Sequence, residues 1–379
     1  MKYIGYFDLQ NSKVKRYYIT SASNKMDYVA QAIKAKTEDV EIISMSSVTE
    51  PKFKLYQKEL KDVCEGVTLQ LPSSWGGTNI FLTKFRTLWN LAYMFFYLLF
   101  RIKKNETILV YHSLGYFDII HWAKQLRKFK LILETNEIYT DVSTLSPRLK
   151  RREYKMFDIA DGYLFATELL HEKLNISNKP HCYNHGTYKV EPQIVEKFND
   201  GKIHVVYAGT FDPRKGGAAA AAAAAEFLPE NYHVHICGFG TTKETNDIKE
   251  IVRQTAQRSK ASISFEGLLK GREYIEFIQR CHIGLSTQDP NAAFNATSFP
   301  SKILSYMSNG LTVVSIRIEA IEKSAVGGHI SYYEEQTPQE IANAIINADI
   351  TNDNRNFIEM LDLNFQNDIK KLIDAVNQL

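Results

Sequence analysis

The chain has 379 residues, of which 44% are hydrophobic and 23% charged, and 46 Lys and Arg against 43 Asp and Glu leave a formal net charge of +3. The length favours two domains, the composition excludes a globally disordered chain, and the charge excess is too small for a nucleic-acid-binding protein. Four cysteines without a CxxC pair indicate thiols in a reducing compartment, so we expect a cytoplasmic protein.

One apolar segment bears on membrane contact. Residues 88–100 form the longest apolar run, but it has 13 residues and contains Asn90, whereas a spanning helix needs about 20. Basic residues flank the run: Lys84, Arg86, Arg101, Lys103 and Lys104. An apolar helix with basic ends can lie on an anionic membrane surface. The alternative is a helix that packs against the N-terminal sheet.

The first half of the chain alternates β-type and helix-type runs. We expect strands at 1–9, 40–45, 107–112, 131–134 and 162–167, and helices at 26–36, 117–129 and 149–159. This alternation predicts a parallel sheet with helices on both faces. Residues 175–202 are then rich in Pro, Gly and polar residues, which predicts the connection between two domains.

The alternation restarts in the second half. We expect strands at 203–208, 233–237, 262–265, 282–286 and 311–316, and helices at 218–228, 247–258, 272–281, 301–308, 338–348 and 357–379. The sequence therefore predicts an α/β protein with two doubly wound Rossmann-like domains, 1–185 and 186–350. A C-terminal helical segment, 351–379, follows and can return to the N-terminal domain.

The motif HVVYAGTFDPRKGG predicts a phosphate site. A strand ends at Gly209, and Arg214-Lys215-Gly216-Gly217 opens a helix. Glycines let the backbone approach a ligand, a helix start offers N–H groups and positive potential, and Lys215 adds a full charge. The alternative is a solvated basic turn.

Two further motifs point to the same domain. In SFPSKILSYMSNGLTVVS, Ser298 or Ser301 can cap a helix and Pro300 suits its first turn. That helix would begin at the carboxyl end of a parallel sheet, where ligands bind in open α/β folds; the alternative is an ordinary αβ unit. In CGFG, Gly238 and Gly240 could admit a nucleotide, although a lone GxG is weak and a simple turn also explains it.

In chain order, YAGTFDPRKG, HICGFG, SFEGLL, HIGLSTQ and FPSKILSYMSNGLTVVS resemble the retaining glycosyltransferases of family 4, also called glycosyl transferases group 1. LILETNEIY, EYKMFDIADGYLFAT and YNHGTY resemble the strand, helix, strand and linker that precede the donor domain. The resemblance covers 203–350 well and 107–186 less closely. It implies the GT-B fold, in which two Rossmann-like domains face a cleft, with the donor held mainly by the C-terminal domain and the acceptor by the N-terminal one.

The resemblance also implies a reaction. A sugar would pass from a nucleotide-diphosphate donor, expected to be a UDP-sugar, to a glycan or lipid-linked acceptor. The expected setting is bacterial capsular or exopolysaccharide synthesis at the inner face of the plasma membrane, with peripheral membrane contact. No cofactor besides the donor substrate is expected. The chain has no DxD, so a metal-bridged diphosphate is not supported.

Several residues match or replace the family's functional positions. Lys215 matches the diphosphate-binding lysine, and Thr210 replaces an arginine for which Arg214 could compensate. Thr297 and Ser305 replace two glutamates that contact the donor sugar and the ribose. The full set of donor-site candidates is Gly209, Thr210, Arg214, Lys215, Gly238, Gly240, Gly267, Leu268, Leu269, Thr297, Ser298, Phe299, Ser301, Lys302 and Ser305.

Candidates for the chemistry are Lys215, Asn136 and His112. Lys215 would stabilise the leaving diphosphate, which in this family helps to deprotonate the acceptor. A histidine often follows the strand at 131–134 in the family, and Asn136 stands there in this chain. His112 ends a strand near the predicted cleft and has either acceptor contact or a local structural role.

Two other functions remain open. The missing glutamates are compatible with a catalytically degenerate GT-B partner protein, and a nucleotide-sugar epimerase on the same fold is a third possibility. No metal site is predicted. His181, Cys182 and His185 have ligand spacing but lie in the expected linker, and His233 and His235 share one face of a strand without an evident third ligand.

Overall fold

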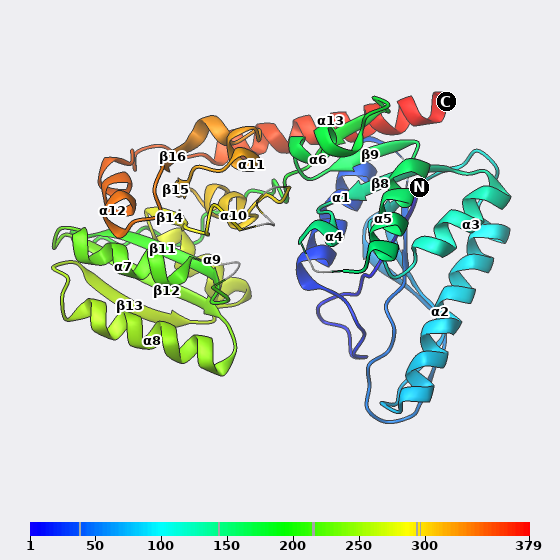
Figure 1. Ribbon diagram of the computed structural model, residues 1–379, viewed down its shortest axis with the longest axis horizontal. Helices are drawn as coiled ribbons and strands as arrows, with labels where there is room; N and C mark the ends of the chain where they lie inside the picture. Colours follow the sequence, from blue (N-terminus) through cyan, green and yellow to red (C-terminus); the bar gives the residue numbers. More distant parts are fainter. Residues whose placement is uncertain (38, 143–144, 214–216, 293–294, 296) are drawn as a thin grey trace. The chain divides into compact units, whose positions relative to one another are not determined.

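The chain folds into two units, each built around a sheet. The computed structural model describes residues 1–37, 39–142, 145–213, 217–292, 295 and 297–379. Unit 1 comprises Met1–Asn184 and Asn364–Leu379, and unit 2 comprises His185–Leu363. In each unit, helices cover both faces of a mainly parallel sheet (Figure 1). The predicted α/β class with Rossmann-like domains is confirmed.

Unit 1 contains an eight-stranded sheet with the order β10-β9-β8-β7-β1-β2-β5-β4. Its strands are β1 (Lys2–Gly5), β2 (Val40–Ser44), β4 (Glu59–Cys64), β5 (Val67–Leu71), β7 (Thr107–Tyr111), β8 (Lys130–Thr135), β9 (Gly162–Phe165) and β10 (His181–Tyr183). Every neighbouring pair is parallel except β4 with β5. The parallel strands are nearly continuous apolar runs, such as TILVY in β7, because helices cover both of their faces.

The helices of unit 1 begin at recognisable signals. They are α1 (Thr20–Lys36), α2 (Ile80–Arg101), α3 (Phe117–Arg127), α4 (Tyr139–Val142), α5 (Pro147–Ile159) and α6 (Glu168–Leu174), and a small sheet pairs β3 (Leu55–Tyr56) with β6 (Ser74–Trp75). The Ser146 side chain caps α5, whose first residue is Pro147, and Asn79 caps α2. Buried side chains from α2, α3, α5 and the sheet form one core.

Unit 2 contains a six-stranded sheet with the order β13-β12-β11-β14-β15-β16. Its strands are β11 (Ile203–Thr210), β12 (Tyr232–Phe239), β13 (Ser262–Gly267), β14 (Ile283–Ser286), β15 (Thr312–Ile316) and β16 (Ile330–Tyr333), all parallel. Numbered within the unit, this order is 3-2-1-4-5-6, the order of dinucleotide-binding domains. The strand order reverses between β11 and β14, and ligands of such sheets bind at the carboxyl ends of these strands.

The helices of unit 2 are short around this reversal point. They are α7 (Ala218–Ala223), the 3-10 turn η1 (Ala224–Phe227), α8 (Thr242–Ala256), α9 (Gly271–Arg280), α10 (Lys302–Ser308), α11 (Glu319–Glu322), the 3-10 turn η3 (Gly327–His329) and α12 (Pro338–Asn347). The alanine run of α7 packs against α8 and α12, with Ala221 and Ala222 fully buried. Small side chains therefore allow three helices to approach closely on one face of the sheet.

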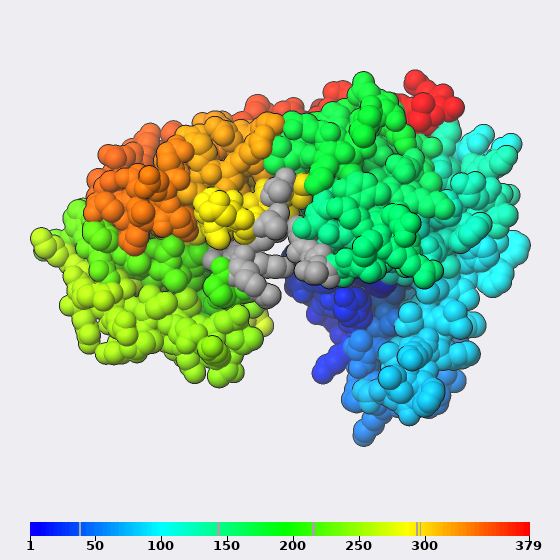
Figure 2. All heavy atoms as spheres, in the orientation of Figure 1, coloured from blue at the N-terminus to red at the C-terminus, as the bar shows by residue number. Residues whose placement is uncertain are grey.

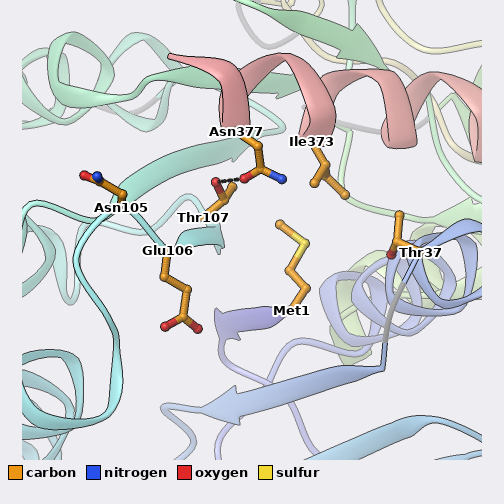
Figure 3. Close-up of a pocket in the computed structure, with 7 residues that line it drawn as sticks. All are labelled: Met1, Thr37, Asn105, Glu106, Thr107, Ile373 and Asn377. Atoms are coloured by element: carbon orange, nitrogen blue, oxygen red, sulfur yellow. Dashed lines mark hydrogen bonds between the residues drawn. The ribbon is translucent and has the colours of Figure 1, made fainter.

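The last helix, α13 (Arg355–Gln378), contributes to unit 1 from Asn364 onward. Its Phe365 ring stacks on Tyr28 of α1 with centroids 5.6 Å apart, and Lys130 Nζ donates to the carbonyl of Asn377 at 2.8 Å. A pocket of about 230 Å³ lies beside this helix end, where Asn377 accepts a hydrogen bond from Thr107 (Figure 3). The pocket is at the amino ends of β1 and β7, opposite to the edge where ligands are expected.

Some element boundaries differ from the sequence-based expectation. The first strand ends at Gly5 rather than at residue 9, and α1 begins at Thr20 rather than at residue 26. The stretch 175–202 is not only a connection, because His181–Tyr183 forms β10. These three residues pair in register with β9, and the ladder of hydrogen bonds outweighs the local Pro and Gly signals.

Candidate functional site

Glycines occupy the last or the next-to-last position of three neighbouring strands at the carboxyl edge of the unit 2 sheet. Gly209 of β11 pairs with Gly238 of β12, and Cys237 pairs with Gly267 of β13. Gly238 has a φ of +151°, and a Cβ there would lie 1.9 Å from the carbonyl oxygen of Gly209. Only glycine fits this position. The glycine therefore allows the ends of β11 and β12 to lie close together at this edge.

The start of α7 lies against the end of β14. A Cβ on Gly217 would lie 1.7 Å from the carbonyl oxygen of Thr287, whose hydroxyl donates to the Gly217 carbonyl at 2.8 Å. The N–H of Gly217 donates to the Tyr207 hydroxyl at 3.2 Å, and that hydroxyl donates to the Thr210 carbonyl at 2.9 Å. Tyr207 thus ties the start of α7 to the end of β11.

The predicted diphosphate residues Arg214 and Lys215 lie outside the described residues, together with Gly216. Their roles stay predictions. The residues on either side, Pro213 and Gly217, are described, and the contacts of Gly217 with Thr287 place the start of α7 at the reversal point between β11 and β14.

Lys302 of α10 also lies at the reversal point between β11 and β14. Its Nζ lies 4.3 Å from the centroid of the Tyr207 ring, and a Cβ on Gly209 would lie 3.0 Å from it. Burial lowers the pKa of Lys302 to about 8, so the side chain is largely cationic at pH 7. Within the described part of the chain, no carboxylate pairs with this ammonium group and no acceptor is hydrogen-bonded to it. A cation without a partner beside open backbone suits an anionic ligand.

The segment before α10 brings the remaining candidates near Lys302 in sequence. Thr297 is buried, and Ser298 and Phe299 are partly buried, with the Phe299 ring 5.4 Å from that of His185. Ser301 precedes the helix, but its side chain does not cap it, so the expected cap by Ser301 is wrong. Its backbone is already helical, whereas a capping side chain requires an extended backbone.

The other donor-site candidates lie on α10, after β12 and at the end of β13. Ser305 on α10 shares a hydrogen bond of 3.1 Å with the Tyr274 hydroxyl of α9. A Cβ on Gly240 would contact Glu244 and Phe211. Gly267 has a φ of +73°, followed by the exposed Leu268 and the partly buried Leu269. The exposed Leu268 offers an apolar surface that a nucleotide base could contact.

In unit 1, Asn136 follows β8 and lies over a buried ion pair. Lys25 of α1 donates to the Asn136 side chain and, at 2.8 Å, to the carbonyl of Asn184, and its Nζ is 3.9 Å from Glu134. Tyr3 donates to the same carboxylate. Burial lowers the pKa of Lys25 to about 8 and raises that of Glu134. Sequence reasoning missed Lys25 and Glu134, which hold the Asn136 amide at the carboxyl end of the sheet.

His112, the other candidate of unit 1, is buried with 1% of its surface exposed. Its ring stacks on Tyr139 with centroids 5.0 Å apart, and its Nε2 lies 3.4 Å from Glu153. The Glu153 carboxylate accepts the backbone N–H groups of Tyr139 and Thr140 at 2.8 and 2.9 Å. Burial lowers the pKa of His112 to about 3. These contacts are those of a structural residue, which was the alternative for His112, and its contact with an acceptor stays a prediction.

With two Rossmann-like units in one chain, the protein has the GT-B fold of the similar solved structures. Residues 202–348 match the family of glycosyl transferases group 1. The expected resemblance to glycosyl transferases group 1 is thereby confirmed for this segment. No curated protein matches the chain by sequence.

Solved structures share the fold over nearly the whole chain. One is the alpha,alpha-trehalose 6-phosphate synthase from Burkholderia multivorans, with a TM-score of 0.61, 10% identity and coverage of 99% of this chain and 96% of the other. Another is the lipopolysaccharide outer core galactosyltransferase WaaB, with a TM-score of 0.62, 13% identity and coverage of 99% of each chain. A third is Alr3699/HepE from Anabaena in complex with UDP and glucose, with a TM-score of 0.59, 12% identity and coverage of 97% of this chain and 98% of the other.

Proposed function

We propose that this chain is a glycosyltransferase that moves a sugar from a UDP-sugar to a glycan or lipid-linked acceptor. The observation that carries the proposal is the position of Lys302. Within the described part of the chain, its ammonium group lies over the Tyr207 ring and beside Gly209, at the glycine edge between β11 and β14, and no carboxylate pairs with it. A diphosphate offers the negative charge that this position lacks.

The reaction we propose is a retaining transfer. Lys302 and Lys215 stabilise the charge that develops on the leaving diphosphate. An oxygen of that diphosphate accepts the proton of the acceptor hydroxyl, so that no protein base is needed. Thr297 contacts the donor sugar and Ser305 the ribose, both as neutral hydrogen-bond partners, and Asn136 contacts the acceptor.

The choice of UDP draws on the neighbours. Alr3699/HepE was solved with UDP and glucose, and WaaB is a galactosyltransferase of the lipopolysaccharide outer core. A comparable role for this chain is the synthesis of a bacterial capsule or exopolysaccharide in the cytoplasm, at the inner face of the plasma membrane.

Helix α2 supports contact with that membrane surface. Its buried side, which includes Met94 and Leu98, packs on the core. Its other side exposes an apolar stripe, which we call the α2 stripe: Ile80, Phe81, Phe85, Leu88, Trp89, Phe96 and Phe100. The helix lies at the surface of unit 1 (Figure 2). Among the described residues, no helix has the length and hydrophobicity needed to cross a bilayer. An amphipathic helix with basic residues nearby can instead rest in the lipid interface.

The proposal is tested by combining binding with turnover. Thermal unfolding is first measured with UDP, GDP and ADP, because a ligand raises apparent stability as ln(1 + [L]/Kd). UDP-sugars are then incubated with the chain, with and without candidate acceptors. We expect stabilisation by UDP and acceptor-dependent release of UDP. Binding without turnover on any acceptor would favour the degenerate partner protein, and conversion of the donor alone into another UDP-sugar would favour the epimerase.

A further inference from the structure

Three histidines meet on one face of the unit 2 sheet, away from the glycine edge. His204 on β11 pairs in register with His233 on β12, and His235 lies two residues further along the same face. One ring nitrogen from each of the three lies within 4.8 Å of the other two. His204 is five residues before Gly209, which corresponds to about 16 Å along a strand. His235 is three residues before Gly238, about 10 Å along β12, and its partner Glu266 directly precedes Gly267, so the histidines lie further back along the strands than the glycine edge.

In two of these rings, the nitrogen that does not face the other histidine, here called the outer nitrogen, is hydrogen-bonded to a carboxylate. His204 Nε2 lies 3.0 Å from Asp200, and His235 Nδ1 lies 2.8 Å from Glu266. A carboxylate accepts hydrogen bonds, so each of these nitrogens carries its hydrogen. The inner nitrogens, His204 Nδ1 and His235 Nε2, then both present lone pairs, yet they face each other at 2.8 Å.

Two facing lone pairs at this distance repel, and either a proton or a metal ion between them removes the repulsion. We propose that a divalent transition-metal ion of the zinc type lies there, bound by His204, His233 and His235. Imidazole is a preferred ligand of such ions. Metal-bound histidines donate their other ring N–H to a carboxylate or carbonyl, and Asp200 and Glu266 occupy these outer positions.

The histidine rings must shift to hold the ion. Zn–N distances of about 2.0–2.1 Å in a tetrahedral site require nitrogens about 3.3 Å apart, so the two facing nitrogens must separate by about 0.5 Å. A nitrogen of His233 lies within 4.8 Å of the other two and must come to the same spacing, and its Nε2 shares a hydrogen bond of 2.8 Å with Ser264. His204 and His235 are buried, whereas His233 is partly exposed. Three protein ligands leave the fourth position for water or another ligand on the exposed side.

A fourth histidine nearby is not a ligand. The Nδ1 of His282 accepts the backbone N–H of His204 at 3.0 Å, which occupies its lone pair. Its ring centroid lies 6.0 Å from that of His204. His282 therefore provides a matched control within the same histidine cluster.

The test uses the full chain without a histidine tag, freed of metal with a chelator. Zn²⁺ binding is measured by calorimetry, and Co²⁺ binding by its visible absorption, which reports tetrahedral coordination. We expect one ion per chain and an intense Co²⁺ spectrum. Glu266→Gln should weaken Zn²⁺ binding by about 10–100-fold through loss of the outer carboxylate. His233→Ala should weaken it at least as much, and His282→Ala should leave it within about twofold.

Folding is monitored separately, by circular dichroism and by thermal stabilisation with UDP, so that loss of metal is distinguished from loss of structure and from failure of the proposed activity. His233 is partly exposed, and its replacement should be tolerated. The metal site would be refuted by the absence of stoichiometric binding, or by equal losses in His233→Ala and His282→Ala. Histidine ¹⁵N chemical shifts that show one imidazolium and do not respond to Zn²⁺ would instead identify the bridging species as a proton and overturn the assignment.

Discussion

Lys302 has an environment that makes its charge depend on pH. Burial lowers its pKa to about 8, so protonation falls from about 90% at pH 7 to about 10% at pH 9. If the ammonium binds the diphosphate, UDP affinity should fall roughly tenfold over this range. Calorimetric titrations at pH 7, 8 and 9 measure the change.

Two variants identify the titrating group. Arginine stays charged at pH 9, so Lys302→Arg should remove the pH dependence while keeping some affinity. Lys302→Ala should show a weak and nearly constant affinity. A tenfold fall that persists in Lys302→Ala would assign the titration to another residue.

Gly238 is the second residue that we expect to be sensitive. In Gly238→Ala, the new methyl group would lie 1.9 Å from the Gly209 carbonyl oxygen at a φ of +151°. Backbone strain of this kind costs about 1–3 kcal/mol, and the close contact adds to it. Urea unfolding should show this loss, whereas Gly328→Ala, whose methyl group would meet nothing within 4 Å, should stay near the wild-type stability. Equal stabilities would show that the two strand ends can separate without cost.

Single residues were predictable from sequence only where a motif is local. Gly209 and Gly238 stood out because each follows an apolar run. Tyr207 and the partner of His233 and His235 did not, because their contacts arise from strand register. His204 comes close to the other two histidines only because β11 pairs with β12. That pairing cannot be inferred from the positions of the three histidines in the sequence.

At the scale of elements, α2 has a largely exposed apolar face, on which Phe85 and Trp89 lie beside Trp75 of β6. Replacing Phe81, Phe85 and Leu88 by serine removes three exposed apolar side chains of the α2 stripe without changing the buried side. We expect binding to anionic vesicles to fall strongly, because each apolar side chain that leaves the interface forfeits about 1.5–3 kcal/mol of burial. Sedimentation with phosphatidylglycerol and phosphatidylcholine vesicles measures the loss.

The control for α2 lies in unit 2. Phe227 and Ile346 are also exposed, and serine at both positions should leave vesicle binding unchanged. Wild-type protein that does not sediment with anionic vesicles would contradict the proposed membrane contact.

The sequence predicted most elements where apolar runs and helical periodicity were clear. It missed β4, whose side chains alternate between partly buried and exposed, because an antiparallel edge strand interrupts the βα alternation on which the prediction relied. For α2 it offered a packed helix or a membrane-surface helix. The structure shows both a packed side and an exposed apolar side, since the apolar residues extend around more of the helix than the core covers.

At the scale of the whole molecule, the last turns of α13 complete unit 1. Phe365, Ile369, Leu372 and Val376 are buried there. Removing 364–379 should cost about 6–12 kcal/mol of burial, which is comparable to the stability of a domain. We expect unit 1 to unfold at much lower urea concentrations, while UDP binding by unit 2 is retained.

Deletion of Leu379 alone is the control, because this residue is exposed. If unit 1 keeps its wild-type free energy of unfolding after removal of 364–379, the helix contributes nothing to the stability of unit 1. Loss of UDP binding together with unit 1 would show that the two units do not fold independently. The two sheets were predictable from the alternation of elements, whereas the contribution of one terminal helix to the first unit depends on long-range packing.

The most direct test of the account is a calorimetric titration of the wild type and Lys302→Ala with UDP. The control is Lys249→Ala, an exposed lysine whose Nζ also lies near an aromatic ring, 5.2 Å from the Phe265 centroid. A charge-assisted contact contributes about 1.5–3 kcal/mol. The account therefore predicts a loss of affinity of about 10–150-fold in Lys302→Ala and none in Lys249→Ala. Equal UDP affinity in all three proteins would contradict it.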